Sequence, residues 1–249
     1  AIFLGFRNTA AYDRYWEARK LWGELLLRCR NLSRQCQSLI NLPQPVQPGA
    51  GRNDIRVRMV HRAIAFCHAL RQQLRGAPDR GEVQALLQPP EWQALQRSGS
   101  QTTLLMHHMG LDLQHCLRSG YIGEPLAASI DNTLSALVSA AASCERIKSS
   151  PLPFSYTLLL HRTAYMYCFL LPFGLVDTIG FMTPFVVGIV AYTFFGLDAL
   201  GDEIEEPFGL LPNDLPLDAI CRTIEINLRE SLGETDLPPP LQAVDYCLL

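Results

Sequence analysis

The chain of 249 residues is 48% hydrophobic and has a mean hydropathy of +0.08. This composition is high for a fully soluble protein, and it excludes a protein that lies mostly within a membrane. The eight cysteines include no CxxC pair, and the chain is too long to depend on a disulfide framework. The thiols therefore indicate a reducing compartment for most of the protein.

Charge is distributed unevenly along the chain, although the net charge is only −3. Residues 1–80 carry 14 Lys and Arg against 5 Asp and Glu, a net of +9, whereas residues 81–249 carry 7 against 19, a net of −12. The basic part could face anionic lipid or an anion path, and the acidic part could attract cations. Solvated surface explains both parts equally well.

The N-terminal segment changes from apolar to charged and aromatic within a few residues. Apolar and aromatic side chains then recur close to the helical period, which predicts one long helix from residue 2 to about residue 40. Because the chain begins within an apolar helix, we expect that its true N-terminus is missing. The segment is then the point where a membrane-embedded helix enters water.

The following part of the chain predicts more helices and no strands. Three prolines and two glycines place a loop at residues 42–51. Helices are predicted at 54–74, in short pieces punctuated by Pro89-Pro90 and Ser98-Gly99-Ser100, at 102–118, and from Pro125 to about Lys148. Since no segment alternates as a strand does, the predicted fold class is all-α.

Two apolar runs, at residues 156–176 and 179–197, each match the roughly 20 residues that span a hydrocarbon core. The short connection between them contains glycine and predicts a helical hairpin. A buried hairpin of a soluble protein is the alternative. His161 and Arg162 lie near one end of the first run, where Arg can reach the interface or face a neighbouring helix, so two membrane spans are favoured.

Motifs of catalysis are absent from the sequence, including the GxSxG elbow, phosphate loops, dinucleotide glycine patterns and HExxH. His61 and His68 are seven residues apart, and His108, His115 and Cys116 form a similar group. Neither spacing matches a known metal or haem pattern, so packing or surface histidines are favoured. No enzyme, cofactor or metal site is predicted.

Four acidic residues follow the second apolar run and could bind calcium: Asp202, Glu203, Glu205 and Glu206. They lack the spacing of an EF-hand loop, and on a helix they would spread over more than one face. A solvated face close to the membrane is favoured over a calcium site.

Ile2 and Phe6 are four residues apart and therefore share one helix face. In a symmetric oligomer each would form a ring of apolar side chains around the axis, and such a constriction can gate ions by dewetting. From these two residues alone, lipid contact or core packing is the favoured role.

Several segments closely resemble the bestrophin family, in its prokaryotic branch, and they follow the family's order along the chain. They are GFRNTAAYDRYWEARKLWG at 5–23, CERIKSSPLPFSYTLLLHR at 144–162, MTPFVVGIVAYTF at 182–194, and EEPFG at 205–209 followed by NDLPLDAICRTIEINL at 213–228. The resemblance implies a homopentameric ion channel with four membrane-spanning helical regions per subunit, a large helical cytosolic part and one central pore. It also implies that the first span and the start of the second are missing here.

The resemblance assigns roles to individual apolar residues. Ile2 and Phe6 fall on ring positions of the narrow neck and form the predicted neck gate. The family's cytosolic aperture comes from an apolar residue beside an acidic-Pro pair. Here the pair Glu124-Pro125 places the aperture at Leu126, with Ile122 as the second candidate.

One departure from the family concerns calcium. Vertebrate bestrophins follow the Pro-Phe-Gly motif with a run of acidic residues that clasps calcium, whereas here the four residues after Phe208-Gly209 are uncharged and only Asp214 is acidic. One carboxylate cannot supply the oxygens that calcium requires. We therefore expect a channel that calcium does not activate through this site.

Four segments are predicted along the chain. Residues 1–30 form the end of the pore-lining neck helix leading into the cytosol, and residues 31–150 form a cytosolic helical region. Residues 151–200 contain two transmembrane helices, and residues 201–249 form a cytosolic C-terminal helical segment and tail.

The sequence thus predicts a pentameric channel that passes small monovalent ions across a bacterial inner (plasma) membrane, with several spans and most of the chain in the cytosol. Its partners are copies of itself, lipid and permeant ions, without nucleic acid. The family favours chloride and other anions, but bacterial relatives can favour cations, so the sign of the selectivity stays open. The alternatives are a non-conducting membrane scaffold or sensor that binds a cytosolic partner, and a histidine-dependent metal or haem enzyme.

Overall fold

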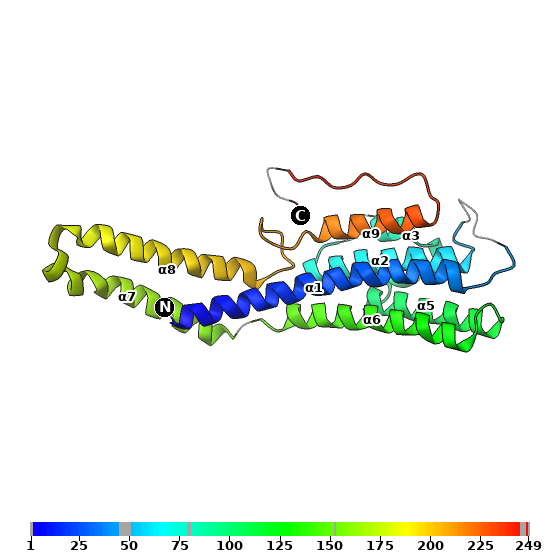
Figure 1. The fold of residues 1–249 in the computed structure, drawn as a ribbon, viewed down its shortest axis with the longest axis horizontal. Helices are drawn as coiled ribbons and strands as arrows, with labels where there is room; N and C mark the ends of the chain where they lie inside the picture. The colour runs from blue at the N-terminus through cyan, green and yellow to red at the C-terminus, as the bar shows by residue number, and fades with distance from the viewer. Residues whose placement is uncertain (1, 45–50, 79–80, 152, 245–247, 249) are drawn as a thin grey trace. The chain divides into compact units, whose positions relative to one another are not determined.

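The computed structural model describes residues 2–44, 51–78, 81–151, 153–244 and 248 (Figure 1). No β-strand occurs in this part of the chain, which confirms the all-α fold class. The helices are α1 (Ile2–Leu39), α2 (Ile55–Arg75), α3 (Glu82–Leu86), α4 (Pro89–Gln96), α5 (Gln101–Arg118), α6 (Glu124–Ser149), α7 (Phe154–Ile179), α8 (Thr183–Glu205) and α9 (Leu217–Ser231), with a 3-10 turn at Gly180–Met182. Most of the predicted loop at 42–51 lies outside the described residues, since 45–50 are not among them.

The chain divides into two compact units, and the long helix α1 contributes residues to both. The first unit consists of residues 1–19 and 147–214 and contains α7 and α8, so we call it the hairpin unit. The second consists of residues 20–146 and 215–249, and we call it the bundle unit. The division into four segments along the sequence stays a prediction.

Helix α2 lies at the centre of the bundle unit, where it contacts α3, α5 and α9. It begins after Asp54, whose side chain accepts a hydrogen bond from the backbone N–H of Arg56 at 2.8 Å, as a helix N-cap does. It ends at Gly76, which has a φ of 63° and therefore adopts the left-handed conformation that favours glycine at this position. These two caps explain why the helix ends where the sequence predicts.

The cysteines of the bundle unit are core residues. Those at 29, 36, 67, 116, 144 and 221 are buried free thiols. Burial raises the pKa of the Cys116 thiol to about 11, and it raises the pKa of Cys36 further. Uncharged buried thiols are poor nucleophiles, so these cysteines act through packing.

Helices α7 and α8 pack against each other as a hairpin within the hairpin unit. Aromatic pairs cross from one helix to the other, with ring centroids 4.9 Å apart for Tyr165 and Phe195 and 5.5 Å apart for Tyr167 and Phe194. The chain reverses at Gly180, which has a φ of 51°. The predicted hairpin is therefore present.

The segment from Leu158 to Glu205, which includes most of α7 and all of α8, is long and apolar enough to cross a membrane by length and composition. Only 6% of its most apolar window is buried. The core hairpin of a soluble protein would be mostly buried, so the soluble alternative from the sequence is disfavoured. Helix α8 continues beyond the second apolar run, which ends at residue 197, and it carries Asp202, Glu203 and Glu205.

Candidate functional site

The first five turns of α1 have one buried face and one exposed face within the hairpin unit. Arg7, Ala11 and Ala18 are fully buried, and their spacing of four and seven residues defines a single helical face. Phe6, one of the two predicted gate residues, is 62% exposed. Ile2 lies in the first turn of α1, but its side chain is outside the described part of the structure.

Arg7 is the centre of a buried charge cluster that joins α1 to α8. Its guanidinium lies 2.6 Å from Asp198 and 3.4 Å from Glu205, and it also pairs with Asp202. The Arg7 side chain is fully buried. A buried cation needs such partners because burial without them costs several kcal/mol.

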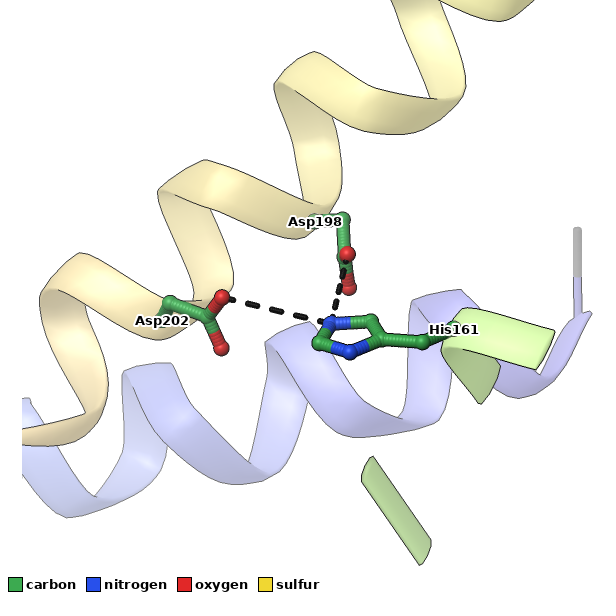
Figure 2. Close-up of side chains that lie close together, drawn as sticks. All are labelled: His161, Asp198 and Asp202. Carbon is green, nitrogen blue, oxygen red and sulfur yellow. Dashed lines mark ion pairs between the residues drawn. The ribbon is translucent and has the colours of Figure 1, made fainter. Parts of the chain in front are cut away.

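His161 adds a third helix, α7, to the same cluster. Its Nε2 lies 2.7 Å from Asp198 Oδ2 and 4.0 Å from Asp202 Oδ2, and Figure 2 shows both carboxylates turned toward this ring nitrogen. The Nε2 atom, the Asp198 oxygen and the Asp202 oxygen all lie within 4.8 Å of one another. The arrangement is one in which a histidine and two carboxylates face a common point.

Arg14 fixes the next turns of α1 through backbone carbonyls rather than carboxylates. Its guanidinium donates to the carbonyl of Glu205 at 2.8 Å and to the carbonyls of Ile147 and Ser150. These carbonyls belong to the ends of α8 and α6, where helical carbonyls lack an intrahelical partner. A cation at two helix C-termini is also favourable to the helix dipoles.

Helices α1 and α8 approach closely at Gly201. The Asn8 side chain donates from Nδ2 to the Leu197 carbonyl at 3.0 Å. A Cβ added at Gly201 would lie 2.5 Å from Asn8 Oδ1, which is closer than real Cβ atoms come to their neighbours in almost every case. An added Cβ would therefore require the Asn8 side chain to move from its position against α8.

The acidic residues after the second apolar run do not gather into one calcium site within the described structure. Asp202 and Glu205 pair with Arg7, Glu203 accepts from the Asn213 side chain at 2.9 Å, and Glu206 lies 3.8 Å from Lys148. The expectation that they spread over more than one helix face is confirmed. Two of them nevertheless have a specific buried partner, which the sequence interpretation as a solvated face missed.

The two candidates for the cytosolic aperture differ in exposure. Leu126, near the start of α6, is 42% exposed, whereas Ile122 is 5% exposed and belongs to the core of the bundle unit. The geometry does not test either assignment, and both stay predictions. Leu126 is the one whose side chain is available to line a path.

Asp214 is a buried turn residue. Its Oδ2 accepts a hydrogen bond from the backbone N–H of Leu211 at 2.6 Å, and the Asp214 side chain is packed against Gly209, where an added Cβ would clash with it. A carboxylate held this way stabilises the turn after α8.

The histidines considered for a metal site bind carboxylates of the bundle unit separately. His61 lies 2.7 Å from Glu234, and His108 lies 2.9 Å from Glu91. His68 lies 3.6 Å from Glu82 and 3.4 Å from Glu225. Among the described residues these histidines belong to no cluster of three metal-ligating side chains.

Burial and charge pull the pKa values of these groups in opposite directions. Burial alone would lower the pKa of His68, but the carboxylates of Glu225 and Glu82 outweigh it and raise the pKa. His68, together with Arg71, lowers the pKa of Glu82 to about 2. For His61, burial outweighs Glu234 and lowers the pKa. The pKa of the first histidine is therefore shifted in favour of the charged form, and that of the second in favour of the neutral form.

Residues 1–230 match the family model described as bacterial/fungal bestrophin protein. The chain belongs to the bestrophin family. A protein of Mesorhizobium japonicum named a voltage-dependent anion channel-forming protein is 44% identical over 242 residues, which cover 97% of this chain and 74% of that protein. The Escherichia coli K12 protein YneE, with the same descriptive name, is 42% identical over 238 residues, which cover 96% of this chain and 75% of that protein.

The fold of this bestrophin also matches solved structures. A crystal structure of a bacterial bestrophin homolog from Klebsiella pneumoniae is similar with a TM-score of 0.85 and 38% identity, over 94% of this chain and 84% of that chain. The named relatives are channel-forming proteins, which confirms the prediction that this bestrophin is not an enzyme. The names of these relatives also support the assignment of the chain to membrane ion channels.

Sequence reasoning missed the cluster of Arg7, His161, Asp198 and Asp202, although a signal for it was present. Asp198 and Asp202 are four residues apart, so they share one face of α8 at the end of an apolar run. Charges at such positions are expensive near a membrane and require partners. An arginine next to an apolar N-terminal segment was the natural candidate.

Proposed function

We propose that this bestrophin is one subunit of a homopentameric channel that passes small monovalent anions passively across a bacterial inner membrane. The curated relatives are named as voltage-dependent anion channel-forming proteins, and they align with nearly the whole of this chain. This name supports anions over cations. The net charge of +9 on residues 1–80 is consistent with an anion path.

The observation that carries the proposal is the orientation of α1 in the hairpin unit. Arg7 is fully buried by its partners on α8, while the adjacent Phe6 is 62% exposed. Since successive residues of a helix are about 100° apart, anchoring Arg7 fixes the direction of Phe6. In a five-fold assembly with α1 at the axis, Phe6 and Ile2 would form two apolar rings that gate ions by dewetting.

The exposed apolar surface of the hairpin supports a location in lipid. Phe169 and Phe173 on α7 are each 70% exposed, and Tyr192 on α8 is 81% exposed. Exposure of such a surface to water is unfavourable, whereas contact with hydrocarbon or with the apolar faces of neighbouring subunits is favourable. We propose that α7 and α8 are two membrane spans and that the bundle unit lies in the cytosol.

The reversal potential of the reconstituted protein in planar bilayers tests the proposal. A tenfold KCl gradient places the chloride and potassium equilibrium potentials about 59 mV on opposite sides of zero. We expect a shift toward the chloride potential. A shift toward potassium would reverse the selectivity, and no current from protein shown to be pentameric by native mass spectrometry would favour the non-conducting scaffold.

Substitution of Phe6 tests the gate. Phe6→Ala, alone and with Ile2→Ala, should widen and wet the constriction, and therefore increase the open probability or the single-channel current. Leu27→Ala is the matched control, because Leu27 is a 53% exposed apolar residue on the same helix in the bundle unit. Equal currents in Phe6→Ala and the unmodified channel would remove Phe6 from the gate.

The same recording separates the two aperture candidates. Leu126→Ala should change the current with little loss of stability, because its side chain is 42% exposed. Ile122→Ala should instead lower the free energy of unfolding, because Ile122 is buried. A changed current in a stable Ile122→Ala protein, with no change in Leu126→Ala, would transfer the role to Ile122.

A further inference from the structure

The two aspartates of the hairpin unit divide their oxygens between Arg7 and His161. Asp198 presents Oδ1 to Arg7 at 2.6 Å and Oδ2 to His161 Nε2 at 2.7 Å. Asp202 repeats the pattern, with Oδ1 paired to Arg7 and Oδ2 at 4.0 Å from the same ring nitrogen. Arg7 thus orients both carboxylates through one oxygen of each. Figure 2 shows the two carboxylates facing the imidazole of His161.

The imidazole nitrogen at this point lies within ion-pair distance of two carboxylates but makes no hydrogen bond with the described residues. The Nε2 atom of His161 is buried and makes no hydrogen bond with the described residues, because its approach to Asp198 lacks hydrogen-bond geometry. The His161 side chain as a whole is 34% exposed, so solvent reaches its edge. A buried ring nitrogen that faces two carboxylate oxygens is left without satisfaction by the protein alone.

The cluster also carries uncompensated negative charge. Arg7 contributes +1, and Asp198, Asp202 and Glu205 contribute −3. Arg14 lies at the Glu205 carbonyl and offsets part of this charge, which leaves a net negative charge of −1 when the imidazole is neutral. A cation bound by the two aspartates would be favoured by this remaining charge. One imidazole nitrogen and two carboxylate oxygens are a ligand set typical of zinc and similar transition metals, whereas calcium takes oxygen ligands only.

The distances are compatible with such an ion. Tetrahedral ligands at zinc distances are separated by about 3.4 Å. The two separations from His161 Nε2, 2.7 Å and 4.0 Å, lie on either side of this value. Small rotations of the side chains would equalise them, and Asp202 has room to move because it is 52% exposed.

We propose that His161, Asp198 and Asp202 bind a divalent transition-metal ion of the zinc type, with Arg7 holding the carboxylates in place. The site joins α7 and α8, and through Arg7 it reaches α1 one residue from Phe6. A bound ion would therefore stiffen the anchor of the neck helix. This consequence for conduction depends on the proposed channel function, whereas metal binding does not.

Metal binding by the purified full chain in detergent micelles tests the site. Zn²⁺ is titrated by calorimetry at pH 7.5, and Co²⁺ is used as a second probe because its visible absorption reports coordination by nitrogen and oxygen. We expect one ion per chain and an increase in the melting temperature. His161→Gln should weaken binding at least tenfold, because it removes the nitrogen ligand and leaves the Arg7 pairs intact.

His107→Gln is the matched control, because His107 is an exposed histidine on α5 of the bundle unit. Asp202→Asn is a second variant, and it should also lose binding while Asp198 and Glu205 still pair with Arg7. Equal Zn²⁺ affinity in His161→Gln and the unmodified chain would overturn the proposal. So would the absence of Zn²⁺ uptake at millimolar concentration by protein that is folded and monodisperse.

Current recordings then separate the metal site from the channel. Stoichiometric Zn²⁺ binding without any current would support the site while contradicting the proposed function. A Zn²⁺-dependent change in current that His161→Gln abolishes and His107→Gln retains would support both. These outcomes are distinct because calorimetry does not require conduction.

Discussion

Helix α2 and the α7–α8 hairpin differ in where they place charged and apolar side chains: α2 buries charged ones, and the hairpin exposes apolar ones. Helix α2 carries five arginines and two histidines, yet nearly all of its residues are buried. The hairpin is strongly apolar, yet only 6% of its most apolar window is buried. In water the exposed apolar surface of the hairpin would be unfavourable, whereas buried charges such as those of α2 are tolerated once they are paired.

The bundle unit satisfies its buried charges internally. Arg58 and Arg62 of α2 both pair with Asp112 on α5, at 2.7 Å and 2.6 Å. Among the described residues of the hairpin unit, by contrast, buried charge lies at the cluster around Arg7 at the end of the apolar segment and at Asp214 in the turn after α8. The comparison indicates that the bundle is stabilised by its own core, whereas the apolar outer surface of the hairpin is not covered by the described part of the chain.

Truncation of one phenylalanine in each unit should give the largest contrast. Phe66 on α2 is 1% exposed, so Phe66→Ala should lower the free energy of unfolding by about 3–5 kcal/mol. Phe181 beside the hairpin turn is 82% exposed, and Phe181→Ala should change the free energy of unfolding by less than about 0.5 kcal/mol. Equilibrium unfolding in mild detergent, followed by tryptophan fluorescence, measures both. A large loss in Phe181→Ala would mean that the oligomer buries this residue.

Removal of the cation from the hairpin cluster should have the next largest effect. Arg7→Met leaves three carboxylates without their partner and should cost about 3 kcal/mol, near the lower limit for a broken buried pair, because Asp202 is 52% exposed. Arg28→Met is the control, because its pair with Glu24 is on the surface and should contribute less than about 0.5 kcal/mol. Similar unfolding free energies for the two variants would contradict a buried cluster.

The close approach of α1 and α8 predicts opposite effects for two glycines of the same helix. Gly201→Ala should lower the stability by about 1–2 kcal/mol, because Asn8 must move and lose its hydrogen bond to Leu197. A Cβ added at Gly196 meets nothing within 4 Å, so Gly196→Ala should raise the stability by up to about 1 kcal/mol through helix propensity. Thermal unfolding of the two variants shows the sign directly. A stabilising Gly201→Ala would mean that the helices are further apart.

Most of the fold could be predicted from local sequence signals. The ends of α2 follow from Asp54 and Gly76, and α6 begins at the Glu124-Pro125 pair, because caps and prolines act within one helical turn. The hairpin follows from the length of its apolar runs. The last turns of α8 lie beyond the apolar run and pair with Arg7 from a distant part of the chain, so hydropathy alone does not mark where this helix ends.

The candidate site could be predicted only in part, because local sequence signals do not show which distant residues pack together. Phe6 was singled out as a gate candidate because helical spacing and the family resemblance both point to it, and this role stays a prediction. The partnership of Arg7 with His161 and Asp198 depends on three helices packing together, and no local pattern encodes which charge pairs with which. Burial of a charge near an apolar segment indicates that a partner exists, but it does not identify the partner.

The pH dependence of stability gives a further test of the bundle unit, in which the sign of the change is predicted rather than its size. His68 lies between Glu82 and Glu225, with Arg71 beside Glu82, and the carboxylates outweigh burial and raise the pKa of His68 above its ordinary 6.5. A raised folded-state pKa means that the contribution of His68 to stability is complete below pH 6.5 and is lost as pH rises through the folded-state pKa. Glu82, with a pKa of about 2, loses its contribution only when the pH falls from 4.5 toward 2.

Stability should therefore decline when the pH is raised above 6.5, and His68→Gln should flatten that decline. His61 contributes a slope of the opposite sign near pH 6.5, because its lowered folded-state pKa means that the unfolded state binds more protons there. This contribution is the same in His68→Gln and in the unmodified chain, so it cancels in the difference between their slopes. His115→Gln, which changes an exposed histidine on α5, should keep the original slope. Denaturant unfolding between pH 6 and pH 8.5 measures the three slopes. An unchanged slope in His68→Gln would show that the carboxylates of Glu82 and Glu225 do not hold the histidine charged, and the bundle would then bury it as it buries His61.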